Sequence, residues 1–209
     1  LHVGDYIETD ILSSARSRVK GTDSKEWWRT SLYQMAQGYE VMITPINLTM
    51  LYNAVANDGV MMKPRYVKAL RDKEYDEIEY LDVEVVDTIC SLEVAQKAQE
   101  LLREVVVAGT ATRAFKNAPY NFSGKTGTAQ IKAEKVYSAT FIGYFPAENP
   151  KYTIYVMLTD LYHEYYASTV AAPVDRTIAD KLYAIDKSFF KTITIDSTKK
   201  TIDEIICNL

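Results

Sequence analysis

The chain has 209 residues, of which 47% are hydrophobic and 25% charged, and its formal net charge is −4. This composition predicts one globular domain with a sizeable core and excludes a disordered or fibrous chain. The 24 Lys and Arg residues form no dense basic run, which argues against a nucleic-acid partner, and no apolar stretch approaches the roughly 20 residues that span a bilayer.

The first third of the chain predicts one helix. Residues 1–30 are polar, mixed in charge and without periodicity, so we expect an irregular segment anchored by Trp27 and Trp28. A helix is predicted from Pro45, because Thr44 can cap it, until Asn57-Asp58-Gly59 ends it. The charged stretch from Arg71 to Glu79 then predicts a solvated loop or hairpin.

Two further helices are predicted later in the chain. The first begins after Ser91, ends near Gly109 and places an apolar stripe on one face: Val94, Ala98, Leu101, Leu102 and Val105. The other runs from about Ser168 to Ala184 with its own stripe: Val170, Val174, Ile178 and Leu182.

Three strands are predicted between these two helices. They are Tyr120–Ile131, Ala139–Phe145 and Tyr152–Thr159, and the turn 146–150 is short enough to join the last two as an antiparallel hairpin. The third run is almost continuously apolar, which is typical of a central strand buried on both faces. Residues 188–209 are expected to form a C-terminal tail after a domain portion at 1–187. The alternation Thr192-Ile193-Thr194-Ile195 has strand character.

The segment Ser123–Gln130 carries the clearest chemical signal, and two functions compete for it. A phosphate-binding P-loop requires a glycine where Pro119 stands and a helix after the lysine, so we reject it. A Lys-Thr-Gly strand beside an active-site cleft fits better. Lys125 and Thr126 together can bind a carboxylate, and Gly127 lets an extended peptide lie flat. The backbone N–H of Thr128 can then point at the carbonyl under attack.

The surrounding residues resemble a known family over about 150 residues. The matching segments are Gly38-Tyr39-Glu40, Thr44-Pro45, 52–59, Lys63-Pro64-Arg65, 107–111, 124–130, 141–146 and 171–174. Their order is similar to that in class B penicillin-binding proteins, and their residues resemble those of the division-type, or septal, branch. The resemblance implies an α+β fold of the penicillin-binding and beta-lactamase type, present in part, with an antiparallel sheet and helices packed on its faces.

The first two active-site motifs of that family, S-x-x-K and S-x-N, are absent where the resemblance would place them. Ser17-Arg18-Val19-Lys20 matches S-x-x-K in letters, but its neighbours are polar, and an activated serine needs a base in a packed setting. We therefore interpret it as a solvated loop. Because the chain begins with Leu1, we expect it to be a piece of a longer protein that carries the nucleophilic serine upstream.

The resemblance implies the C-terminal part of a peptidoglycan D,D-transpeptidase, which on its own would be inactive. Stem peptides and beta-lactams would be its ligands, cell-division proteins its possible partners, and no cofactor or metal is implied. Its parent would be anchored in the bacterial cytoplasmic membrane, with the domain on the periplasmic side. A non-catalytic binding module and a D,D-carboxypeptidase or beta-lactamase relative remain alternatives.

Overall fold

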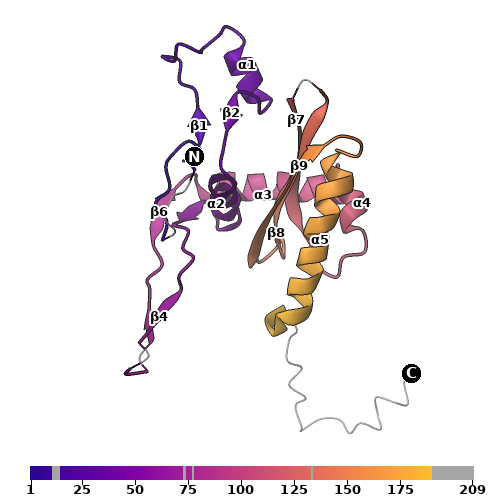
Figure 1. Ribbon diagram of the computed structural model, residues 1–209. Helices are drawn as coiled ribbons and strands as arrows, with labels where there is room; N and C mark the ends of the chain where they lie inside the picture. The colour runs from indigo at the N-terminus through magenta and orange to yellow at the C-terminus, as the bar shows by residue number, and fades with distance from the viewer. Residues whose placement is uncertain (11–14, 73, 77, 133, 190–209) are drawn as a thin grey trace, which may run out of the picture.

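The computed structural model describes residues 1–10, 15–72, 74–76, 78–132 and 134–189. Figure 1 shows the elements in chain order. The helices are α1 (Ser31–Ala36), α2 (Pro45–Ala56), α3 (Leu92–Val107), α4 (Thr112–Phe115), α5 (Ala167–Ile185) and the 3₁₀ turn η1 (Lys187–Phe189). The strands are β1 (Arg18–Val19), β2 (Val41–Met42), β3 (Val60–Met62), β4 (Ala69–Arg71), β5 (Ile78–Tyr80), β6 (Val85–Thr88), β7 (Ser123–Lys132), β8 (Val136–Phe145) and β9 (Tyr152–Leu161).

The largest sheet of the described residues is antiparallel, with the order β7-β8-β9. The predicted hairpin between the last two strands is confirmed. The expectation that the third run is buried on both faces is wrong, because β9 lies at an edge of this sheet as the described residues form it, and β8 lies in the middle. β8 is the strand buried on both faces, whereas β9 alternates between buried and partly exposed residues.

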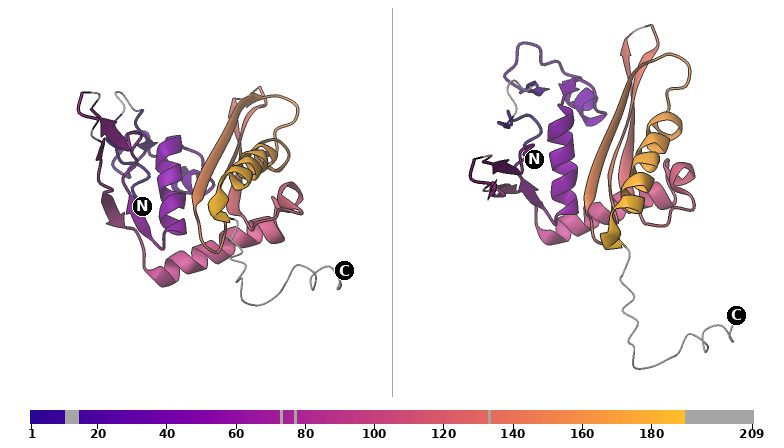
Figure 2. Two further views of the ribbon diagram at one scale, coloured as in Figure 1. Left: turned by 90° about the horizontal axis from the view of Figure 1, so that it is seen from below. Right: turned by 60° about the horizontal axis from the view of Figure 1, so that its bottom comes forward.

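Two helices cover opposite faces of this sheet, and α3 runs across one end of it (Figure 2). On one face α5 packs on aromatic residues of β8, including Phe141 and Phe145. On the other face lies α2, where the Asn53 Nδ2 atom is 3.5 Å from Thr153 Oγ1 of β9. The expected α+β architecture, with an antiparallel sheet and helices on its faces, is confirmed.

The stripe that α5 turns toward the sheet differs from the predicted one. Val174 and Ile178 are exposed, while the buried positions are Ala167, Ala171, Ala172, Asp175 and Ala179. Alanine brings the helix backbone close to the sheet, and the aromatic rings of β8 fill the space that larger helix residues would otherwise occupy.

The predicted starts of α2 and α3 are confirmed by their caps. The Thr44 hydroxyl accepts the N–H of Asn47 at 3.3 Å, and the Ser91 hydroxyl accepts that of Val94 at 3.4 Å. The predicted stripe of α3 is only partly covered. Val94 and Leu101 are 56% and 66% exposed, because no described element packs over that part of the helix.

The N-terminal part adds small two-stranded sheets, β1-β2, β3-β6 and β4-β5. The charged stretch from Arg71 to Glu79 lies in the β4-β5 hairpin, which projects from the rest of the molecule in Figure 1. The expectation that Trp28 anchors the first segment is wrong, because its side chain is 69% exposed. The helix α1 was not predicted, since six residues without a side-chain cap leave little periodic pattern.

Candidate functional site

Lys125, Thr126, Gly127 and Thr128 lie on β7, at the other edge of the sheet. Successive side chains of a strand point to opposite faces. Ser123 pairs with Tyr144, and Tyr144 pairs with Thr153, whose hydroxyl lies beside Asn53 of α2. Ser123 therefore lies on the face that α2 covers. Lys125 and Gly127 follow it at two-residue steps, so they lie on the same face. The register places Thr126 and Thr128 on the α5 face, so an extended ligand along the edge of β7 would meet groups from both faces.

The ammonium group of Lys125 lies beside the residue that follows it. Its Nζ atom donates to the backbone carbonyl of Thr126 at 2.8 Å, and the side chain is exposed. A carboxylate that approaches this edge of β7 would therefore meet a positive charge and, one residue on, a hydroxyl group. Charge-assisted hydrogen bonds to a carboxylate are the strong ones among protein hydrogen bonds.

Gly127 lies close to a side chain of its neighbour on β8. A Cβ atom at this position would lie 2.5 Å from the Thr140 hydroxyl, closer than real contacts allow. That hydroxyl also donates to the Gly127 carbonyl at 3.3 Å. The absence of a side chain therefore serves the packing of β7 on β8, and it also leaves the strand flat beside Lys125.

The hydroxyl groups of Thr126 and Thr128 connect β7 to two distant segments. Thr126 Oγ1 lies 2.8 Å from Thr110 Oγ1, in the turn between α3 and α4. Thr128 Oγ1 accepts the N–H of Ala167, the first residue of α5, at 3.1 Å. That contact satisfies a free amide at the start of a helix whose own N-cap residue, Tyr166, makes no side-chain cap.

Thr110 is a residue of this site to which the sequence assigned no role. It belongs to the segment 107–111 that carried part of the family resemblance, but a hydroxyl pair across 16 residues follows no local spacing rule. Only the fold brings the α3-α4 turn to β7.

Ser17 and Lys20 do not form a nucleophile and base pair in the structure. The Ser17 hydroxyl accepts the N–H of Thr44 at 3.1 Å, next to the start of α2. The Lys20 ammonium lies 3.7 Å from Glu26 and 3.5 Å from Glu40. Each side chain therefore has a structural partner. The segment is not the solvated loop that the sequence predicted, because Arg18–Val19 form strand β1, which pairs with β2.

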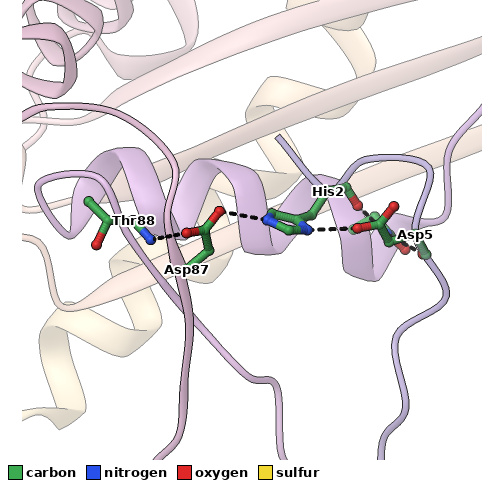
Figure 3. A network of polar contacts seen from close by, with 5 residues as sticks. His2, Asp5, Asp87 and Thr88 are labelled. Atoms are coloured by element: carbon green, nitrogen blue, oxygen red, sulfur yellow. Dashed lines mark hydrogen bonds and ion pairs between the residues drawn. The ribbon is translucent and has the colours of Figure 1, made fainter.

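The N-terminal residues are held to β6 by a separate polar cluster (Figure 3). His2 Nδ1 lies 2.6 Å from Asp5 and Nε2 lies 2.8 Å from Asp87, whose other oxygen accepts the N–H of Thr88 at 2.7 Å. The hydrogen bonds to Asp87 and Asp5 raise the pKa of His2. Because both ring nitrogens contact carboxylates, we interpret this histidine as a structural residue that connects the N-terminus to β6, and not as a catalytic base.

No three His, Cys, Asp or Glu side chains among the described residues gather in a way that could hold a metal ion. Among the described helices, none has the length and hydropathy that crossing a membrane requires.

Comparison with known proteins gives consistent matches. The family model described as penicillin binding protein transpeptidase domain matches residues 6–180. Penicillin-binding protein 2A of Bacillus subtilis is 27% identical over 189 residues, which are 83% of this chain and 26% of that protein. The peptidoglycan D,D-transpeptidase FtsI homolog of Mesostigma viride is 27% identical over 201 residues, 87% of this chain and 33% of that protein.

Solved structures give the same result. Penicillin binding protein 3 from Mycobacterium tuberculosis, complexed with aztreonam, superposes with a TM-score of 0.69 and is 30% identical, covering 81% of this chain and 41% of that chain. The chain therefore spans between a quarter and a third of the two curated relatives and less than half of this solved structure.

Proposed function

The chain belongs to the penicillin-binding protein transpeptidase family, and from that premise we propose that it is the C-terminal part of a serine D,D-transpeptidase that cross-links peptidoglycan. The observation that carries the proposal is the edge of β7, where an exposed Lys125 stands beside a hydroxyl and a glycine. The residues of the matching segments, above all Gly38-Tyr39-Glu40 and 52–59, support the septal branch.

The reaction proceeds by acyl transfer. A serine upstream of this chain attacks the carbonyl carbon of the penultimate D-alanine of a stem peptide, and the peptide bond to the terminal D-alanine breaks. The nitrogen of that D-alanine takes up the proton that the serine hydroxyl gives up. An acceptor amine then attacks the acyl-enzyme ester and forms the cross-link; the ester bond to the serine breaks, and the serine oxygen takes up a proton from the amine. A beta-lactam acylates the same serine.

This chain supplies recognition and electrostatic stabilisation. Lys125 and Thr126 bind the terminal carboxylate of the stem peptide, and the flat backbone at Gly127 lets the peptide extend along β7. The N–H of Thr128 stabilises the oxyanion, with a second N–H from the serine itself. Thr128 is suited to this role because its own hydroxyl is held by the first residue of α5, which restrains the strand at this position.

The proposed setting follows from the same reaction. Stem peptides are assembled into the wall outside the bacterial cytoplasmic membrane, so the domain acts on the periplasmic side, on a parent protein anchored in that membrane. Cell-division proteins are its partners at the septum.

The test compares two lysines in the complete protein. We expect Lys125→Ala to lower the second-order rate of acylation by a fluorescent penicillin at least tenfold, because losing a charge-assisted contact to a carboxylate costs about 2 kcal/mol. Lys20→Ala is the matched control and should change the rate less than twofold, since its partners Glu26 and Glu40 lie in the N-terminal segment and not on β7.

Equal acylation rates for the two variants would refute the assignment of Lys125. The 209-residue chain on its own should take up no label, because the nucleophile is missing. A complete protein that binds no penicillin covalently would favour the non-catalytic module. Release of D-alanine from a pentapeptide without a cross-linked product would indicate a carboxypeptidase.

A further inference from the structure

The hydroxyl pair between Thr110 and Thr126 connects a rigid turn to the carboxylate site. The two Oγ1 atoms are 2.8 Å apart, and either of them can be the donor. Thr126 is partly exposed and Thr110 is exposed, so the pair lies at the surface of the molecule beside the edge of β7.

The turn that presents Thr110 is closely packed on both sides of it. A Cβ atom on Gly109 would lie 2.8 Å from the backbone of Val105, so a larger residue cannot replace this glycine without a shift. On the other side Ala111 is fully buried, and its N–H donates to the Val105 carbonyl at 3.1 Å. Although the Thr110 side chain is exposed, its backbone position is therefore restrained.

The direction of the hydrogen bond between the hydroxyls decides what Thr126 offers a ligand. A hydroxyl has one proton and two acceptor lone pairs. If Thr126 donates to Thr110, its oxygen presents lone pairs to an incoming carboxylate and repels it. If Thr110 donates to Thr126, the proton of Thr126 remains free to donate to the carboxylate, and each bond polarises and strengthens the next.

We propose that Thr110 is a positioning residue of the carboxylate site, whose hydroxyl donates to Thr126 and so directs the Thr126 proton to the carboxylate of the ligand. The inference rests on the proposed function. It adds a residue from the α3-α4 turn to a site formed otherwise on β7.

The experiment uses the complete protein and two probes, a penicillin with a free carboxylate and its methyl ester. Thr110→Val keeps the shape of the side chain and removes the hydroxyl, and we expect it to slow acylation by the free penicillin about fivefold to tenfold. Acylation by the ester should change less than twofold. The ratio of the acylation rate with the free penicillin to that with the ester therefore falls. A merely structural defect would slow both reactions and leave this ratio unchanged.

Further variants make the test specific. Thr110→Ser retains a hydroxyl and should restore the ratio. Thr112→Val removes a neighbouring hydroxyl that donates to the Gly109 carbonyl at 2.8 Å, and it should leave the ratio unchanged. In a Thr126→Val background, Thr110→Val should have no additional effect, because the group it orients is gone. Thr110→Ala serves if the valine variant does not fold, since truncating an exposed side chain leaves no cavity.

Equal slowing of both probes by Thr110→Val, or an undiminished effect in the Thr126→Val background, would overturn the positioning role and leave the proposed function intact. Failure of the unsubstituted protein to react with either probe would overturn both. A ratio that falls with valine and recovers with serine supports the proposal.

Discussion

At the scale of single residues, Asp175 is the most unusual group in the described structure. It lies on the sheet-facing side of α5, is fully buried, and no hydrogen-bond donor among the described residues reaches either of its oxygens. Burial raises the pKa of Asp175 from 3.8 to about 8. A buried carboxyl group without a partner disfavours its charged form, so this one is expected to be protonated at neutral pH.

The raised pKa predicts how stability depends on pH. Between about pH 4 and pH 8 the folded state holds a proton that the unfolded state has released, so the free energy of unfolding falls as the pH rises through this range. We expect Asp175→Asn to remove that slope. Its free energy of unfolding should then exceed that of the unsubstituted chain by a difference that grows to a few kcal/mol between pH 4 and pH 8. Urea unfolding at several pH values measures this free energy.

The matched control for Asp175 is Glu79→Gln, which changes an exposed carboxyl group on β5. Its pH slope is the baseline against which the slope of Asp175→Asn is compared. An Asp175→Asn variant that keeps the full pH slope would show that the carboxyl is not buried without a partner.

At the scale of elements, the contact of β7 with β8 depends on a pair of glycines. Gly124 and Gly143 are directly opposite each other in the register, just before Lys125. A Cβ atom on Gly143 would overlap the Ser123 carbonyl oxygen and lie 2.5 Å from the Phe122 ring and 2.9 Å from the Gly124 Cα atom. The backbones and the ring therefore approach as closely as they do because no side chain intervenes.

We expect Gly143→Ala to lower the free energy of unfolding by about 1–3 kcal/mol, because two backbone segments must move to admit a methyl group. In the complete protein it should also slow acylation, since the displaced Ser123 carbonyl lies two residues before Lys125. Gly4→Ala is the control. Its Cβ atom would meet only the Val19 side chain, at an ordinary 3.4 Å, and the expected change is within about 0.5 kcal/mol. Equal urea midpoints for the two variants would contradict the prediction.

At the scale of the whole molecule, the outer edge of β9 lacks a neighbouring strand among the described residues. The strand is rich in apolar residues, and Met157 on it is 45% exposed. An uncovered edge offers unpaired N–H and C=O groups to another chain. The segment Thr192–Ile195, to which the sequence analysis assigned strand character, lies outside the described residues.

We predict that the 209-residue chain either associates with itself through β9 or covers that edge with its own C-terminal residues. Light scattering measures the association, and amide exchange measures protection of each strand. Met157→Lys should weaken the association, because charged side chains oppose pairing at a sheet edge. A monomer with strongly protected amides at 152–161 and freely exchanging amides at 192–195 would contradict both routes.

The sequence by itself determined the features that depend on neighbouring residues. The caps at Thr44 and Ser91 begin their helices where expected, because a capping hydroxyl acts within one turn of its own position. The β8-β9 hairpin followed from the short turn at 146–150, and the Lys-Thr-Gly segment was recognisable from its order of residue types.

Only the tertiary structure decided which surfaces meet. It placed β9 at an edge, turned the alanines of α5 rather than its valines to the sheet, and left Trp28 exposed. It also brought the hydroxyl of Thr110 to Thr126 and that of Thr128 to the first amide of α5. These contacts join residues far apart in the chain, and a local pattern records only that a side chain is apolar or polar, not which distant surface it meets.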